Sequence, residues 1–157
     1  MITWPDKYSP DKASVHVRNE IEINAAPGIV WAWLVRAKDW PSWYGNSHDV
    51  VIEGGASDLQ AGSRFRWKTF GISLNSKVEE FLPNQRLAWS ARGMGVDAYH
   101  AFLIEGRPNG SHVLTEETQN GWLASLSNVL RPRNMSEKHQ IWLEGLRART
   151  QSGMPSR

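Results

Sequence analysis

The chain has 157 residues, enough for one domain with a substantial hydrophobic core, and its 40% hydrophobic and 22% charged residues are ordinary for a globular protein. It contains no cysteine, which excludes disulfide scaffolds, thiolate metal sites and cysteine nucleophiles. The formal net charge of +2 is too small for a protein that binds nucleic acid mainly by electrostatic attraction, so we predict no nucleic-acid partner.

The two ends of the chain differ from its middle. Residues 1–13 contain two prolines and several charges, so we predict an arm that is poorly ordered or lies as a strap on the surface. Residues 14–150 are predicted to form a single domain, and residues 151–157 a disordered tail. No basic segment followed by an apolar one begins the sequence, and no apolar run approaches the length of a membrane span, so we expect a cytoplasmic protein without an integral membrane segment.

The hydrophobic period changes abruptly at the start of the domain. Apolar and polar residues alternate over 15–23, which predicts a strand with one buried face. Apolar residues then recur at helical spacing after Pro27, a residue that suits the first turn of a helix. The aromatic corner DWPSWY at 39–44 follows, and we expect two short helices between the first and second strands.

Most of the remaining domain reads as strands separated by turns. The clearest turn is Pro-Asn-Gly-Ser at 108–111, which predicts a hairpin. With the first strand, the following segments are expected to complete a seven-stranded antiparallel sheet: 48–53, 63–70, 72–81, 87–91, 98–107 and 112–119.

Two helices are predicted at the C-terminal end of the domain. Residues 122–130 form the first, and Pro132 must interrupt it because proline lacks a backbone donor and clashes with the preceding turn. Asn134 is the expected N-cap of the second helix, with Glu137 completing a capping box. The second helix should face the concave side of the sheet with one stripe of side chains: Met135, His139, Trp142 and Leu146.

Five segments, in this order, resemble the START-like (SRPBCC) superfamily, the polyketide cyclase/dehydrase and lipid-transport family. They are IEINAAPGIVWAWL, DWPSWY, VEEFLPNQRLAWSARG, the EET-x-x-G of residues 116–121 and HQIWLEGLRART. The resemblance covers about residues 15–150 and implies an α+β helix-grip fold, in which the sheet curves around the long C-terminal helix and leaves an apolar pocket. It does not imply one activity, because members include carriers, receptors, cyclases and co-chaperones.

Nine tryptophans are the compositional peculiarity of the chain. They can fill the core between sheet and helix, or line a cavity and stack on a planar ligand, and the two interpretations overlap. We predict that a small hydrophobic or aromatic ligand contacts the inward faces of the strands and helices and the aromatic corner, at Trp43, Tyr44, Phe65, Trp67, Leu74, Trp89, His100, Phe102, Trp122, Met135, His139 and Trp142.

One histidine and one glutamate are candidate catalytic residues. His100 shares the apolar face of its strand, and either Glu116 or Glu117 on the neighbouring strand must point inward. Leu114 favours Glu116, whereas Val113 favours Glu117. We name His100 and Glu116 as the candidate pair, a general base and the group that orients it, which could remove an acidic proton beside a carbonyl. The alternative is a buried histidine with a purely structural hydrogen bond.

His100, His139 and one glutamate could also bind a metal as two histidines and a carboxylate. No local motif, such as a histidine pair at i and i+4, supports this, so we predict neither a metal nor another cofactor. Three functions stay open: binding or transport of a hydrophobic ligand, catalysis of the cyclase/aromatase or dehydratase type, and a co-chaperone-like interaction module with a collapsed core. The sequence also leaves open whether the protein is a monomer or a dimer.

Overall fold

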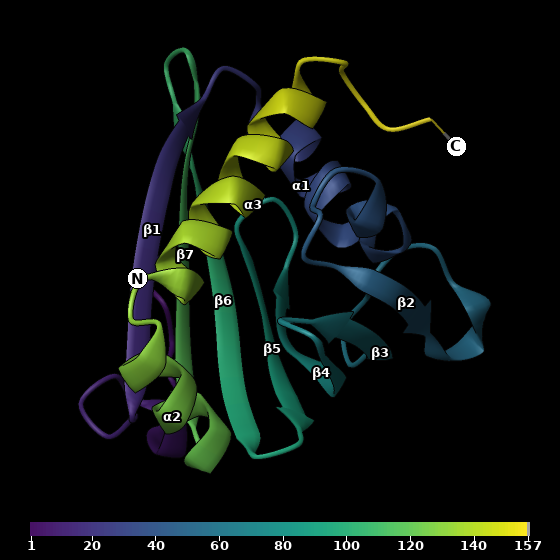
Figure 1. Cartoon of the computed structure of the whole chain (residues 1–157). Helices are drawn as coiled ribbons and strands as arrows, with labels where there is room; N and C mark the ends of the chain where they lie inside the picture. Colours follow the sequence, from purple (N-terminus) through teal and green to yellow (C-terminus); the bar gives the residue numbers. More distant parts are fainter. Residues whose placement is uncertain (157) are drawn as a thin grey trace.

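The alternating segments form an antiparallel sheet whose concave face holds the long C-terminal helix, as Figure 1 shows in the computed structural model. The structure describes residues 1–156. Within them the sheet has seven strands: β1 (Val15–Ile23), β2 (His48–Ile52), β3 (Arg64–Thr69), β4 (Ile72–Leu82), β5 (Arg86–Gly93), β6 (Val96–Arg107) and β7 (Gly110–Asn120). Their order, β1-β7-β6-β5-β4-β3-β2, confirms the predicted α+β helix-grip fold.

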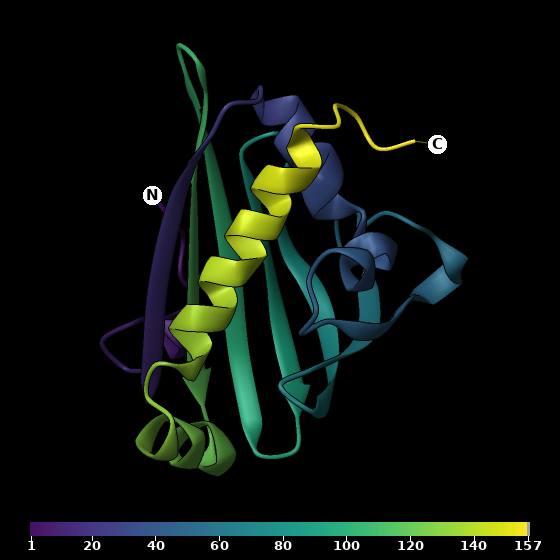
Figure 2. The same cartoon turned by 45° about the horizontal axis from the view of Figure 1, so that its top comes forward.

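Three α-helices accompany the sheet in the described part of the chain: α1 (Pro27–Val35), α2 (Trp122–Leu130) and α3 (Asn134–Thr150). A 3₁₀ helix at Ala37–Ser42 is the second of the two short helices expected between β1 and β2. Further 3₁₀ turns lie at Asp6–Tyr8 and Glu53–Gly55. Figure 2 shows α3 running diagonally across the concave face, with α1 near its C-terminal end and α2 near its N-terminal end.

Pro132 separates α2 from α3, as its missing donor and steric clash require. The predicted stripe of Met135, His139, Trp142 and Leu146 is buried. The expected capping box is wrong. Arg133 already has helical dihedral angles, so the backbone amide of Glu137 donates to the Arg133 carbonyl oxygen at 2.9 Å, and Asn134 is inside the helix rather than at its cap.

Apolar side chains cover both faces of β6 and β7. The concave face carries the main core, centred on the fully buried Trp40 and Trp89 under α3. The opposite face is covered by the N-terminal arm, because Ile2 and Tyr8 pack there on a second apolar cluster that includes Tyr99 and Leu114.

Polar contacts hold the arm in place. The Tyr8 hydroxyl donates to Asp97 Oδ1 at 2.6 Å, Lys7 Nζ donates to Asp97 Oδ2 at 2.8 Å, and Thr118 Oγ1 donates to the Tyr8 carbonyl oxygen at 2.9 Å. The structure therefore shows the arm as a strap, the second of the two alternatives predicted for it.

The C-terminal tail begins after α3. The Gly153 carbonyl oxygen accepts a hydrogen bond of 2.8 Å from Trp33 Nε1 on α1. The last residue of the tail predicted to be disordered, Arg157, lies outside the described residues. Across residues 1–156, each helix is too short or too polar to cross a membrane.

Candidate functional site

A cavity of about 260 Å³ lies between the concave face of the sheet and helices α2 and α3. Strand side chains such as Leu74 and Ala91 form one wall, and Met135 and Trp142 of α3 form the other. Leu123 and Arg131 border the cavity from α2 and from the break after it. This open space is at odds with the collapsed core expected for a co-chaperone-like module.

Eight of the twelve residues predicted to contact a ligand line this cavity: Tyr44, Trp67, Leu74, Trp89, His100, Met135, His139 and Trp142. The three tryptophans among them belong both to the core and to the cavity wall, so the two interpretations of the tryptophans coincide there. Aromatic rings in this wall pack directly on one another. The Tyr44 ring stacks on Trp142 with a centroid distance of 4.5 Å.

The other four predicted residues lie elsewhere. Phe65 packs behind the cavity on Trp40, and Phe102 stacks on Trp89, so both are core residues. Trp43 packs against α3 at Gly145, where an added Cβ would come within 2.7 Å of the Trp43 carbonyl oxygen.

Trp122, at the start of α2, is 65% exposed, because most of the large apolar side chains of this short helix face solvent. The prediction also missed lining residues on the turns beside the sheet and on α2, including Phe70, Met94 and Ser127. Their place in the wall depends on how the chain packs after each turn, which no local pattern records.

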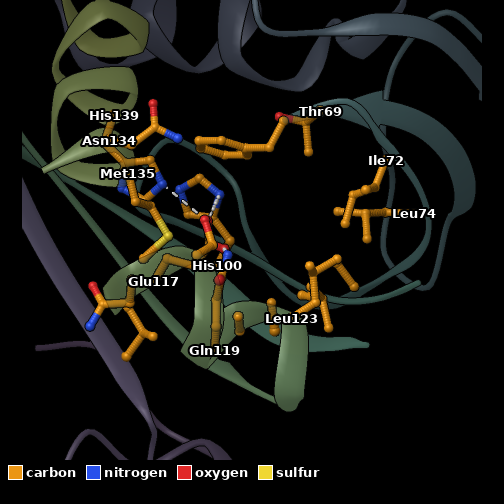
Figure 3. Close-up of a pocket in the computed structure, with 18 of the residues that line it drawn as sticks. Thr69, Ile72, Leu74, His100, Glu117, Gln119, Leu123, Asn134, Met135 and His139 are labelled. Carbon is orange, nitrogen blue, oxygen red and sulfur yellow. Dashed lines mark hydrogen bonds and ion pairs between the residues drawn. The ribbon is translucent and has the colours of Figure 1, made fainter. Parts of the chain in front are cut away.

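Three buried ionisable side chains meet in the wall of the cavity. Glu117 Oε2 lies 3.2 Å from His100 Nδ1 and 3.0 Å from His139 Nε2. The two imidazole rings are nearly parallel, with an interplanar angle of 8° and centroids 4.7 Å apart. Figure 3 shows His139 reaching down from α3 while His100 and Glu117 rise from the sheet. We call these three residues the His–Glu–His cluster.

The register of the sheet explains this convergence. His100 on β6 is paired directly with Glu117 on β7 and with Trp89 on β5, and directly paired residues share one face of a sheet. His139 completes the cluster from the buried stripe of α3.

The structure corrects the choice of glutamate. Glu116 lies on the other face of β7, where its Oε2 is 2.8 Å from His16 Nε2, so Glu117 is the partner of His100. Leu114 was misleading because the arm buries it on that other face.

The hairpin turn carried a usable signal. Arg107 pairs with Gly110 across a two-residue loop. Whenever the loop has an even number of residues, each even-numbered residue of β6 pairs with an odd-numbered residue of β7. A partner of His100 must then share a face with Glu117. Tyr99 also lies on the outer face, stacked on Tyr8.

Hydrogen bonds around the cluster stabilise the ionised carboxylate of Glu117. Burial alone would raise the pKa of Glu117, but the two imidazoles and the amide of Gln119, which donates to Oε1 at 2.6 Å, outweigh it and lower this pKa. Burial lowers the pKa of His100 below its ordinary 6.5, against the opposing effect of Glu117, and its Nε2 lies 2.7 Å from Thr115 Oγ1.

Several buried polar atoms of the cavity-lining side chains have no hydrogen-bond partner within residues 1–156. They are the indole nitrogens of Trp89 and Trp142 and Nδ1 of His139. A buried polar group without a partner costs free energy, on the order of 1–3 kcal/mol each. These atoms could therefore hydrogen-bond to a ligand.

The family model for polyketide cyclase/dehydrase and lipid transport matches residues 14–150, most of the chain. The protein belongs to this family. No curated protein matches the sequence. The family has the START-like fold seen here, and its description names polyketide cyclases, dehydrases and lipid transport.

Solved structures share this fold. The hypothetical protein jhp0584 from Helicobacter pylori is 33% identical, with a TM-score of 0.87 over 94% of this chain and 95% of that one. TTHA0849 from Thermus thermophilus is 17% identical, with a TM-score of 0.74 over 90% of this chain and all of that one. The di-domain ARO/CYC StfQ from the steffimycin biosynthetic pathway is 13% identical, with a TM-score of 0.71 over 88% of this chain and 51% of its own length. At these last two identities, the likeness concerns the fold alone.

Proposed function

We propose that the protein binds a small hydrophobic or aromatic molecule in the cavity, with an oxygen atom of that molecule at the polar part of the wall. The proposal is carried by the combination, in one cavity, of apolar walls with buried donors and acceptors that have no partner among residues 1–156. Ligand sites commonly combine a mostly apolar lining with a few polar groups that fix orientation. A cytoplasmic location is part of the same proposal and rests on the sequence pattern alone.

The size of the cavity narrows the ligand class. Its volume of about 260 Å³ is just under the usual lower limit of ~300 Å³ for small-molecule pockets. The aromatic wall formed by Trp67, Trp89 and Trp142 favours stacking on a flat ring. A molecule of one or two rings therefore fits better than a long acyl chain, and transport of such a molecule is the extension of binding that the family description suggests.

Titration with 2-naphthol, which has two rings and one hydroxyl group, tests this proposal. Binding should change the fluorescence of the cavity tryptophans. Ala91→Phe fills the cavity from β5, whereas Ser73→Phe adds the same side chain at an exposed position of β4. We expect Ala91→Phe to weaken binding about 10-fold or more, which is ~1.4 kcal/mol, and Ser73→Phe to leave it unchanged. Equal affinity in all three proteins would contradict the proposal.

Cyclase- or dehydratase-like acid–base catalysis is a second candidate function, favoured by the carboxylate held between two imidazoles. Both His100 nitrogens already have protein partners, Glu117 and Thr115. With Nε2–H of His139 donated to Glu117, Nδ1 of His139 keeps a free lone pair and is the better candidate base. This assignment moves the proposed base from His100 to His139, and the orienting group from Glu116 to Glu117.

Hydrogen–deuterium exchange of 2-tetralone, a two-ring ketone, tests the second candidate without knowledge of the substrate. A base that removes the proton beside the carbonyl gives an enolate, which takes deuterium from solvent when it returns to the ketone. We expect His139→Gln to slow the exchange by ~10²-fold or more and His16→Gln, on the outer face, to leave it unchanged. If exchange with the wild-type protein is no faster than exchange in buffer alone, the proposed catalysis is contradicted, but ligand binding is not.

A further inference from the structure

We infer that the His–Glu–His cluster is a binding site for one divalent transition-metal ion, of which Zn²⁺ is the representative, with its open side toward the cavity. The inference goes beyond the proposed ligand binding and does not depend on it. His100, Glu117 and His139 are all buried, and each offers one ligand atom, with these three atoms within 4.8 Å of one another.

The donor set suits such an ion. Two imidazoles and one carboxylate form a recurrent binding set for zinc and related first-row ions. Ligands at about 2.0–2.2 Å from a tetrahedral ion stand about 3.3–3.6 Å apart. Glu117 Oε2 is already 3.2 Å and 3.0 Å from the two nitrogens, so these distances need to lengthen by only a few tenths of an ångström. The two rings are nearly parallel, so they have to tilt and move closer for both lone pairs to reach one ion.

The hydrogen-bond partners of His100 suit either neutral tautomer of its ring. Without a metal, Nδ1–H donates to Glu117 and the Thr115 hydroxyl donates to Nε2. When an ion takes the Nδ1 lone pair, the ring proton must sit on Nε2, where Thr115 Oγ1 accepts it at 2.7 Å. The hydroxyl can then donate to the Ala101 carbonyl oxygen, 3.3 Å away. This ring therefore keeps one proton in both states, and that proton does not have to leave the site.

Of the other two ligands, Glu117 is held by a neighbouring group, and His139 has its second ring nitrogen free within the described residues. Gln119 Nε2 donates to Glu117 Oε1, which fixes the carboxylate and leaves Oε2 for the ion. The proton of His139 moves to Nδ1, a position with no competing partner among residues 1–156. Hydrogen bonds from neighbouring groups to metal ligands are typical of protein metal sites.

The cavity supplies an open coordination position. The three protein ligands all line it, and no cysteine is present that could complete a closed structural site. A water molecule or an oxygen of the ligand would take the fourth position. One ion with one carboxylate leaves a net charge of +1, which favours an anionic or strongly dipolar oxygen there.

Calorimetric titration of chelator-treated protein with Zn²⁺, together with the visible spectrum of the Co²⁺ form, tests the inference. Glu117→Gln removes the bridging carboxylate at almost unchanged volume. Glu116→Gln is the matched control, because it removes the neighbouring carboxylate from its histidine on the outer face. We expect one ion per chain in wild type and Glu116→Gln, and loss of stoichiometric binding in Glu117→Gln. Thr115→Val should bind ~10–100-fold more weakly, because it removes only the partner of His100 Nε2.

A measurement on the wild-type protein removes any dependence on how the variants fold. Long-range ¹H–¹⁵N spectra of the histidines should show Zn²⁺ shifting Nδ1 of His100 and Nε2 of His139, while His16 and His112 stay in place. Absence of 1:1 binding, unchanged affinity in Glu117→Gln, equal loss in Glu116→Gln, or shifts confined to His16 and His112 would each overturn the inference. Failure of 2-naphthol to bind would contradict the proposed function and leave the metal site standing.

Discussion

Glu116 and Glu117 are neighbours in the sequence, and each is within 3.2 Å of a histidine nitrogen, yet they belong to two different environments. Glu116 lies on the outer face of β7 beside His16, whose side chain is 34% exposed. Glu117 is enclosed between His100 and His139, whose side chains are 3% and 1% exposed. Solvent screens the first pair, and such exposed pairs contribute little to stability. The enclosed carboxylate is stabilised by its protein partners rather than by solvent, and this environment makes the inner face the candidate site.

The largest effect on stability is expected on the inner face, at Trp142. This side chain is buried in the core and in the cavity wall at once, and it contacts Tyr44 and Trp89. Trp142→Ala should lower the free energy of unfolding by about 3–5 kcal/mol, measured by urea denaturation. The control Trp122→Ala changes a tryptophan that is 65% exposed and should cost less than about 0.5 kcal/mol. Similar losses in both variants would contradict the described packing.

The arm on the outer face provides the next test. Tyr8→Ala removes a buried ring that stacks on Tyr99 and a hydrogen bond to Asp97, so we expect a loss of about 3 kcal/mol in the free energy of unfolding. The affinity for 2-naphthol should not change, because this ring lies across the sheet from the cavity. A variant that folds well but loses affinity would show that the two faces are coupled.

Substitution of the two glutamates should produce a smaller difference in the free energy of unfolding. Glu117→Gln replaces a carboxylate that accepts hydrogen bonds from His139 and Gln119 and leaves these buried donors incompletely paired, which should cost about 2 kcal/mol. Glu116→Gln should cost less than about 1 kcal/mol, since its pair is partly exposed. Thermal denaturation of both variants in the absence of added metal measures this difference.

The smallest effect on stability is expected for the contact between the arm and Asp97 of β6, and this effect depends on pH. Partial burial would raise the pKa of Asp97, but its contacts with Lys7 and Tyr8 outweigh this and hold the pKa below the ordinary 3.8. Because the pKa is lower in the folded state, this contribution is complete above pH 3.8 and is lost as the pH falls through the folded value. Wild type and Asp97→Asn should differ by less than about 1 kcal/mol at pH 6 and converge at lower pH. A difference that grows on acidification would contradict this assignment.

The fold could be predicted because its signals are repeated along the chain. Alternation marked the first strand, turns separated the others, Pro132 marked the break before α3, and the stripe from Met135 to Leu146 identified the face of that helix. The capping box failed because a pattern of residue types does not fix where the backbone begins to turn, and the helical angles of Arg133 put the first turn earlier.

The site was harder to predict, because its members come from β6, β7 and α3. The apolar pattern alone could not choose between the two glutamates, since the arm gives β7 a second buried face through Leu114. The parity of the hairpin loop would have settled the choice. The exposure of Trp122 and the packing of Phe65 behind the cavity follow from tertiary arrangement, for which the sequence offers no periodic signal.

Side-chain NMR of the histidines and tryptophans during a titration with 2-naphthol tests the central claim most directly, because it reports on both faces of the sheet in one experiment. The account predicts saturable shifts of the imidazole signals of His100 and His139 and of the indole signals of Trp67, Trp89 and Trp142, while His16 and His112 on the outer face do not move. Signals of the inner face that stay unchanged, or shifts confined to the outer face, would contradict ligand binding in this cavity.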